Sequence, residues 1–99
     1  MLVLEAISEG PTYGYALLNK LKMRTNGYFT LKEGTLYPIL YRLEDDGLIR
    51  AQWSEPEGRT APKKIYTVTE TGKAARQDRY QIWVDFTDTV NSFYKKGSE

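Results

Sequence analysis

The hydrophobic period of this chain changes near Gly47, and that change constrains the fold more than any other feature. In "EGTLYPILYRLEDDGLIRAQW", residues 33–53, apolar side chains first recur at three- and four-residue spacing, at Leu36, Ile39, Leu40 and Leu43. This spacing places them on one face of a helix that ends at Asp46–Gly47. Apolar residues then alternate with polar ones from Ile49 to Trp53, which predicts a strand. A core-facing helix therefore leads through a turn into a strand.

The other face of this predicted helix carries Tyr37, Pro38 and Tyr41. A face that needed only solubility would carry Lys, Glu or Gln, because these residues favour helices whereas proline disfavours them. The outer face is therefore interpreted as a contact surface. The alternative is that the tyrosines lie over neighbouring side chains and that Thr35 caps the helix, so that Pro38 lies in the first turn, where its missing N–H is harmless.

Two shorter helices are predicted before this one. Residues 1–10, "MLVLEAISEG", carry apolar residues in helical phase and stop at Gly10, a residue favoured just after a helix end. Residues 11–27, "PTYGYALLNKLKMRTNG", predict about three turns, with Thr12 able to cap the start and Asn26–Gly27 closing the end. One side of this second helix is expected to carry Tyr15, Leu18, Leu21 and Lys22.

The second half of the chain predicts a hairpin and a long helix. Residues 54–62, "SEPEGRTAP", are rich in turn formers, and "KKIYTVTETG" resumes with β-branched and aromatic residues. Two strands joined by a basic loop form a hairpin. From Thr71 the helical spacing returns for at least five turns, at Ala75, Arg79, Ile82, Trp83, Phe86, Val90, Phe93 and Tyr94.

This order of elements predicts an α+β fold that is mainly α. Three helices followed by a two-stranded hairpin form a winged helix-turn-helix domain, expected over residues 1–70, and the long helix over residues 71–99 is expected to mediate dimerisation. In such domains the third helix enters the major groove of DNA and the wing reaches an adjacent groove or the backbone. Hydroxyl groups of Thr35, Tyr37 and Tyr41 can bind phosphates or base edges, and the ring of Pro38 can contact a thymine methyl.

Composition excludes several classes of function. The chain has 99 residues, the size of one domain, and contains neither cysteine nor histidine. Disulfides, thiolate nucleophiles, imidazole bases and most zinc sites are thereby excluded, so neither an enzyme nor a cofactor is expected. The apolar runs are far shorter than the roughly 20 residues of a membrane span, and no leader is recognised, so the chain is expected to be cytoplasmic without membrane contact.

The net charge of +1 says little about an acidic partner, but its distribution is uneven. Residues 49–73 contain five basic residues and three acidic ones, and the basic ones are Arg50, Arg59, Lys63, Lys64 and Lys73. A basic tip on a neutral body is a weaker signal for nucleic acid than a basic domain would be. Taken alone, such a cluster is more typical of a solvated face than of a nucleic-acid contact.

Three motifs resemble the PadR family of bacterial transcriptional regulators. They are "GPTYGYALLNKL", "EGTLYPILYRLEDDGLI" and "GRTAPKKIYTVTETGK", and together they cover nearly the whole chain. The resemblance implies a homodimeric winged-helix repressor that binds double-stranded DNA at an inverted repeat and releases it on binding a small molecule. The single long helix after the wing is similar to the compact subfamily, some members of which respond to several hydrophobic drugs. The chain departs from the pattern of the family in two respects: its first helix is shorter, and its wing carries fewer basic residues.

The expected DNA interface combines the third helix, the wing and the start of the second helix. Tyr37, Pro38 and Tyr41 are expected to face the groove. Further contacts to phosphates or bases are expected from the amides after Thr12 and from Tyr13, Thr35, Arg42, Arg59, Lys63 and Lys64.

Two alternatives concern the same surface. Arg42 could instead pair on the helix surface with Glu44 or Asp46, and Glu44, Asp45 and Asp46 are expected on the solvent side. At the level of the whole domain, the winged helix could serve protein assembly without binding DNA in a sequence-specific manner.

The long helix carries more apolar surface than so small a domain can cover. Pairing of two such helices would bury the stripe formed by Ile82, Trp83, Phe86, Val90 and Phe93. In the drug-responsive relatives a tryptophan on the equivalent helix stacks on the effector, and the resemblance implies this role for Trp83 in "RYQIWVDFTDTV". Expected neighbours of a small planar aromatic effector are Tyr80, Thr87 and, from the partner's first helix, Met1 and Leu4. The alternative is that Trp83 only packs in the dimer seam.

Overall fold

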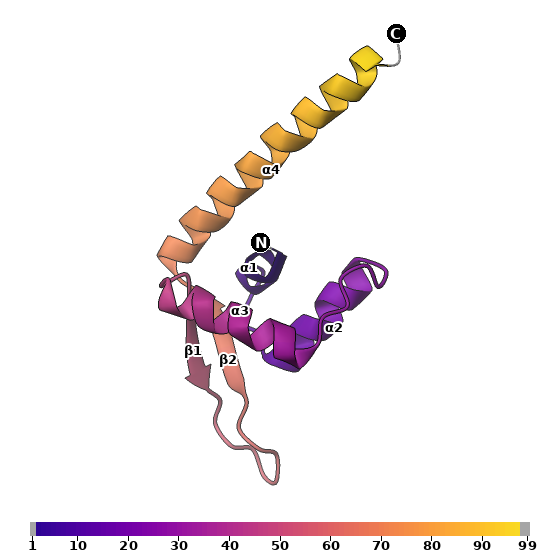
Figure 1. Cartoon of the computed structure of the whole chain (residues 1–99). Coiled ribbons are helices and arrows are strands. Elements are labelled where there is room, and N and C mark those ends of the chain that lie inside the picture. The colour runs from indigo at the N-terminus through magenta and orange to yellow at the C-terminus, as the bar shows by residue number, and fades with distance from the viewer. Residues whose placement is uncertain (1, 98–99) are drawn as a thin grey trace.

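The computed structural model describes residues 2–97 and, within them, contains four helices and a two-stranded antiparallel sheet (Figure 1). The elements in chain order are α1 (Leu2–Ser8), α2 (Gly14–Arg24), α3 (Glu33–Asp45), β1 (Ile49–Trp53), β2 (Lys64–Val68) and α4 (Glu70–Gly97). Three helices thus precede a hairpin and a long closing helix. The predicted fold class is confirmed, and so is the change from helix to strand near Gly47.

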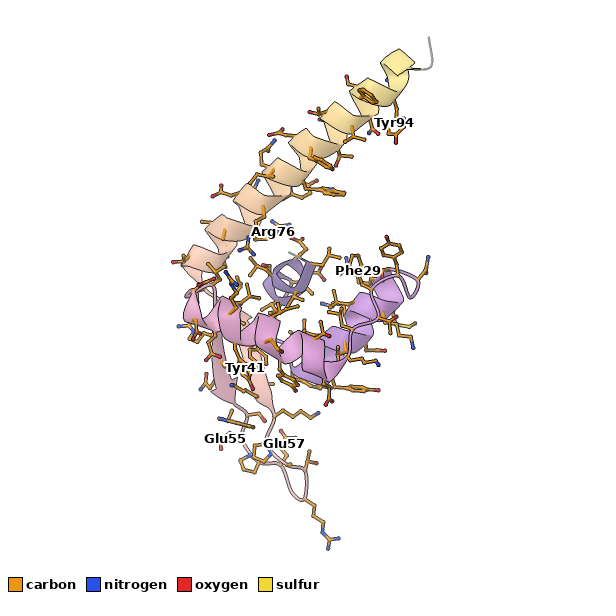
Figure 2. All side chains as sticks on the ribbon, viewed as in Figure 1. Phe29, Tyr41, Glu55, Glu57, Arg76 and Tyr94 are labelled. Atoms are coloured by element: carbon orange, nitrogen blue, oxygen red, sulfur yellow. The ribbon has the colours of Figure 1, made fainter. Side chains whose placement is uncertain are left out.

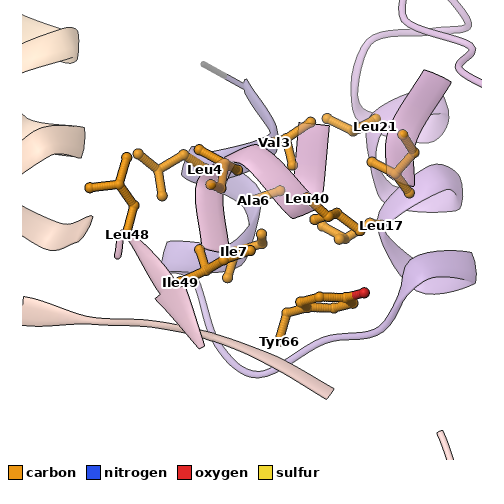
Figure 3. Close-up of a cluster of buried hydrophobic side chains, with 12 residues drawn as sticks. Val3, Leu4, Ala6, Ile7, Leu17, Leu21, Leu40, Leu48, Ile49 and Tyr66 are labelled. Carbon is orange, nitrogen blue, oxygen red and sulfur yellow. The ribbon is translucent and has the colours of Figure 1, made fainter. Parts of the chain in front are cut away.

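The hydrophobic core is built around α1 (Figure 3). All three short helices and both strands contribute buried side chains, namely Val3, Leu4, Ala6, Ile7, Leu17, Leu21, Leu36, Leu40, Leu43, Leu48, Ile49 and Tyr66. Each fully buried large apolar side chain contributes about 1.5–3 kcal/mol to folding. The predicted stripe of α3 is confirmed, because its three leucines are buried and Ile39 packs against them.

The start of α2 differs from the expectation. Thr12 does not cap the helix, because its backbone pairs with Tyr66 of β2: the Thr12 N–H donates to the Tyr66 carbonyl at 3.1 Å, and the Tyr66 N–H donates back at 2.7 Å. Tyr13 occupies the N-cap position without a side-chain bond.

Of the residues expected on one side of α2, Leu21 is buried and Leu18 packs against the core, whereas Tyr15 is 72% exposed. Leu17, which was not expected on that side, is fully buried.

The end of α2 follows the expectation closely. Asn26 and Gly27 both adopt positive φ, at 52° and 83°, and the Gly27 N–H donates to the Lys22 carbonyl at 2.8 Å. This is the bond that closes many helix ends, because left-handed residues turn the chain back onto the last carbonyls. The Asn26–Gly27 pair therefore terminates α2 as its sequence predicted.

The start of α3 differs from the alternative in which Thr35 caps the helix. Lys32, and not Thr35, occupies the N-cap position, so Pro38 lies inside the helix beyond its first turn. The carbonyl of Gly34 then lacks the N–H that another residue at position 38 would donate. Because Gly34 is exposed, water can satisfy this carbonyl. The alternative in which Pro38 occupies a harmless first-turn position is therefore wrong.

The wing is a regular antiparallel hairpin that projects from the helical body (Figure 1). Ile49 pairs with Val68 at its base, and Trp53 pairs with Lys64 at its outer end. Beyond the strands, Glu57 and Thr60 form an isolated bridge around Gly58, whose φ is +56°. The loop predicted from "SEPEGRTAP" is thus a compact turn.

The joint between the wing and α4 is formed by the Thr69 side chain and by backbone contacts. The Thr69 hydroxyl donates to the Gly47 carbonyl at 2.7 Å and accepts from the Gly72 N–H at 3.0 Å. Gly72 is buried, and a Cβ at this position would overlap the Leu48 carbonyl oxygen. These contacts attach the start of α4 to the turn that follows α3.

Beyond this joint, α4 extends away from the body (Figure 1). A two-pronged ion pair between Arg76 and Glu5, with N–O distances of 2.6 and 2.8 Å, attaches α4 to α1. The helix begins at Glu70, next to the boundary predicted between residues 1–70 and 71–99. The division into a DNA-binding and a dimerisation domain stays a prediction.

Candidate nucleic-acid interface and ligand groove

The outer face of α3 carries an exposed stripe formed by Thr35, Pro38, Tyr41 and Arg42. These residues recur at three- and four-residue spacing on the side opposite the buried leucines. Within residues 2–97 Arg42 forms no ion pair, so the predicted alternative, a pair with Glu44 or Asp46, is not formed. The stripe combines a cation, two hydroxyl groups and an apolar ring, a set that can contact both phosphates and base edges.

Tyr37 lies on the flank of α3 and not on its exposed stripe. Its ring is half-buried against the core, and its hydroxyl oxygen would lie 2.6 Å from a Cβ placed on Gly14. The ring of Tyr41 lies beside it, with the centroids 6.3 Å apart, but Tyr41 is 53% exposed. Of the two tyrosines, Tyr41 therefore offers the larger surface to a partner, and Tyr37 fixes the contact between α3 and the start of α2.

The basic residues of the wing occupy different environments. Arg59 is fully on the outside of the turn, whereas the ammonium of Lys63 lies 4.3 Å from the ring centroid of Tyr13, at the start of α2. Lys64 is half-buried, and its Nζ lies 4.0 Å from Glu44 Oε1. Glu44 was expected on the solvent side and is instead half-buried beside this lysine.

Two acidic side chains of the wing were not singled out from the sequence. Glu55 and Glu57 are exposed on the loop between the strands (Figure 2). They offset the charges of Arg59 and Lys63, so the loop is close to neutral. The wing therefore contributes less to nonspecific attraction of phosphate than the basic residues alone suggested.

Behind these residues, Tyr66 is fully buried between the wing and the helices (Figure 3). Burial raises the pKa of its phenol, and Tyr37, Glu44 and Tyr41 add to this effect. Its hydroxyl group forms no hydrogen bond with any other described residue. Tyr66 therefore stays neutral and acts as the platform on which the wing packs against the helices.

A second feature is an apolar groove of about 550 Å³ between α1 and the first half of α4. Its lining residues are Leu2, Leu4, Glu5, Phe29, Arg76, Arg79, Tyr80 and Trp83. We call this feature the α1–α4 groove. Three of the residues expected at an effector site, Leu4, Tyr80 and Trp83, thus line one groove. Leu4 lines the groove from the same chain, whereas the expected effector site takes Leu4 from the partner's first helix.

Two other residues expected at the effector site lie elsewhere. Thr87 does not line the groove, and its hydroxyl donates to the Trp83 carbonyl at 2.6 Å, within α4. Met1 lies outside the described residues. Conversely, Phe29 was not expected, because it belongs to the irregular segment between α2 and α3, where no periodicity indicates which side chains turn inward.

The apolar stripe of α4 is exposed in the single chain. The exposed fractions are 64% for Ile82, 52% for Trp83, 61% for Phe86 and 75% for Phe93, while Val90 is half-buried. Tyr94, near the far end of the helix, is also exposed (Figure 2). Monomeric proteins seldom expose so large a contiguous apolar surface.

Within residues 2–97, no helix has the combination of length and hydropathy that crossing a membrane requires. The same residues contain no group of three or more metal-ligating side chains.

Several known proteins similar to this chain are regulators of transcription. The model of the transcriptional regulator PadR-like family matches residues 3–78. Uncharacterized protein X of Lysinibacillus sphaericus is 30% identical over 92 residues, which are 93% of this chain and 84% of that protein. The negative transcriptional regulator PadR of Bacillus subtilis is 29% identical over 76 residues, which are 77% of this chain but only 41% of that protein.

Solved structures agree with these matches. A PadR family transcription regulator from Clostridium difficile superposes with a TM-score of 0.82 at 29% identity, and the match covers 93% of each chain. PadR-like proteins are transcriptional regulators, which confirms the prediction from the sequence that this protein is not an enzyme. A match over most of the chain, together with this fold, establishes that the protein belongs to the PadR-like family of transcriptional regulators.

Proposed function

We propose that this protein is a homodimeric repressor that binds an inverted-repeat operator through α3 and the wing. The observation that carries the proposal is the division of α3 into two faces. One face buries Leu36, Leu40 and Leu43, and the other leaves Thr35, Pro38, Tyr41 and Arg42 exposed. The second face contributes no side chain to the hydrophobic core, so its outward surface is available to DNA.

In the proposed complex the stripe of α3 enters the major groove. The Tyr41 hydroxyl and the ring of Pro38 lie in the middle of the stripe, where they are suited to read base edges and thymine methyls. Thr35 and Arg42 flank them and are suited to phosphates at the groove edge. Arg59 at the wing tip and Lys63 beside Tyr13 supply two further phosphate contacts.

Dimerisation rests on the exposed stripe of α4. A twofold pairing of α4 helices would bury the same patch on both subunits, which is the geometry of an isologous interface. It would also place two copies of α3 at a fixed spacing, as an inverted repeat requires. The match to the PadR-like family supports this arrangement.

The α1–α4 groove is proposed as the effector site. Its apolar lining and the half-exposed indole of Trp83 suit a small planar aromatic compound, which could stack on the indole. Because the groove lies between α4 and the DNA-binding body, a bound compound would change the angle between them and the spacing of the two α3 helices.

A gel-shift experiment with the purified protein and its own promoter fragment tests DNA binding. We expect a shifted complex that resists competition by scrambled DNA of the same length. A winged helix used only for protein assembly would give no such selective shift, so equal competition by both DNAs would contradict the proposal.

The effector site is tested by fluorescence in a Trp53→Phe background, where Trp83 is the remaining tryptophan. We expect planar aromatic compounds to quench its emission at micromolar concentration and to weaken operator binding. Trp83→Ala should abolish the effect on operator binding and leave the dimer folded. If operator release persists in Trp83→Ala, the tryptophan only packs in the dimer seam.

A further inference from the structure

Lys64, at the outer end of β2, is surrounded by side chains of its own domain. Its Nζ lies 4.0 Å from Glu44 Oε1 and 5.7 Å from the ring centroids of both Tyr41 and Tyr66. Only about a third of its side chain is exposed. A carboxylate and two aromatic faces therefore share one ammonium group, which they can attract by charge pairing and by cation–π interaction.

The strand geometry explains why Lys64 points towards the helices. Residues two apart on a strand share one face of the sheet, so Lys64 lies on the same face as Tyr66. Tyr66 is fully buried against the helical body. Lys64 therefore projects towards α3, where Glu44 and Tyr41 lie at three-residue spacing on neighbouring turns.

We infer that Lys64 is a positioning residue that holds the Tyr41 ring and the wing in a fixed mutual orientation, and is not a phosphate contact. The inference rests on the proposed function, because Tyr41 is the residue of α3 proposed to read bases. Among the described residues, Tyr41 links Lys64 to the exposed stripe, through the contact between its ring and the ammonium group. Loss of the contact between Lys64 and the Tyr41 ring would therefore lower the discrimination between DNA sequences more than the overall affinity for DNA.

The neighbouring residue provides the matched control. Lys63 has the same charge and lies next to Lys64 in the chain, but it is exposed and contacts Tyr13 at the start of α2. A phosphate contact contributes about one unit to the slope of log affinity against log salt concentration. Lys63→Gln should therefore lower this slope by about one unit and weaken binding to all DNA sequences alike.

The test compares Lys64→Gln, Glu44→Gln and Lys64→Arg with this control, using operator and scrambled DNA at two salt concentrations. Lys64→Gln and Glu44→Gln should each lower the ratio of operator to scrambled affinity by about two- to fivefold, with less than half the slope change of Lys63→Gln. Lys64→Arg keeps the positive charge and should therefore retain the wild-type ratio of operator to scrambled affinity. If Lys64→Gln instead behaves like Lys63→Gln, or if Glu44→Gln tightens binding to both DNAs, Lys64 is a phosphate contact.

A measurement without DNA separates this inference from the proposed function. In aromatic carbon–proton correlation spectra of the free protein, Lys64→Gln and Glu44→Gln should move the Tyr41 ring signals, while Lys63→Gln should move those of Tyr13. Unmoved Tyr41 signals would overturn the inference even if the wild type selects its operator. Failure of the wild type to distinguish operator from scrambled DNA would overturn the proposed function itself.

Discussion

At the scale of single residues, the contact between Tyr37 and Gly14 connects the recognition helix to the rest of the DNA-binding domain. The hydroxyl group of Tyr37 occupies the space that a side chain at position 14 would need. Gly14 is buried and lies at the first position of α2, next to Tyr13. The absence of a side chain at position 14 therefore sets how closely α3 approaches α2.

This contact predicts that Gly14→Ala destabilises the protein. The added methyl group would lie 2.6 Å from the Tyr37 hydroxyl, and overpacking of this kind costs typically 1–3 kcal/mol, which outweighs the smaller gain in helix propensity. Tyr37→Phe in the same chain should recover most of the loss, because it removes the clashing oxygen.

Urea unfolding monitored by circular dichroism checks this prediction. Gly34→Ala is the matched control, since a Cβ at this exposed helical position meets no atom within 4 Å and should raise stability by up to about 1 kcal/mol. Equal free energies of unfolding for Gly14→Ala and Gly34→Ala would show that Tyr37 does not occupy the space above Gly14.

A second residue contact, between Glu5 and Arg76, predicts a pH dependence. The hydrogen bond from Arg76 lowers the pKa of Glu5, so its stabilising contribution is complete above the ordinary glutamate pKa of about 4.3 and is lost as the pH falls through the lowered folded value. Both side chains are more than a third exposed, so we expect at most about 1 kcal/mol.

The comparison of wild type with Glu5→Gln isolates this contribution. The pKa of Glu9 is also lowered, by Arg24 and Lys20, but Glu9 titrates in both proteins and cancels in the difference. The difference in free energy of unfolding should be constant from pH 5 to 7 and shrink in acid, as expected for a carboxylate with a depressed pKa. A difference that grows as the pH falls below about 4 would contradict the ion pair.

At the scale of elements, the joint at the start of α4 is tightly packed. Thr69 bonds to the turn after α3, and Gly72 packs directly on the backbone of Leu48. The orientation of α4 is thereby linked to the end of α3. A change in the angle of α4 would be transmitted through this joint to the recognition helix.

We therefore expect Gly72→Ala to destabilise the protein by about 3 kcal/mol or more, since the added Cβ would overlap a backbone oxygen that cannot rotate away. Thermal unfolding by circular dichroism measures the effect, again with Gly34→Ala as the control. A Gly72→Ala protein that unfolds at the wild-type temperature would show that α4 does not pack on Leu48.

Sequence reasoning succeeded for elements with strong periodicity and failed where packing chooses between similar patterns. The leucines of α3 specify one buried face and the alternation from Ile49 to Trp53 specifies a strand, so both elements were predicted correctly. The burial of Leu17 and the exposure of Tyr15 were not, because both are apolar and only the surrounding helices decide which is buried. The environments of Lys63 and Lys64 could not be predicted either, because they depend on Tyr13 and Glu44, which are distant in sequence.

At the scale of the whole molecule, the single chain leaves the apolar stripe of α4 uncovered. Its extents of 65 × 29 × 20 Å reflect a long helix whose second half projects beyond the body, with apolar side chains exposed along it. In the proposed dimer a second copy would cover this helix. The proposed dimer thus follows from the same surface that makes the monomer unfavourable.

We expect sedimentation to show a dimer at micromolar protein concentration and the unfolding midpoint to rise with protein concentration. Phe86→Lys places a charge in the middle of the exposed stripe and should shift the protein towards monomer, whereas Lys22→Glu on the exposed side of α2 should not. A wild-type protein that stays monomeric at micromolar concentration would contradict the proposed interface.

The measurement that tests the central claim most directly is fluorescence anisotropy of operator and scrambled DNA with wild type, Tyr41→Ala and Lys63→Ala at two salt concentrations. If the stripe of α3 reads bases, Tyr41→Ala should lose about 1–3 kcal/mol of discrimination between the two DNAs. Lys63→Ala should weaken binding to both DNAs alike and lower the slope of log affinity against log salt concentration by about one unit. Equal losses for both DNAs with both variants would contradict base reading by the exposed face of α3.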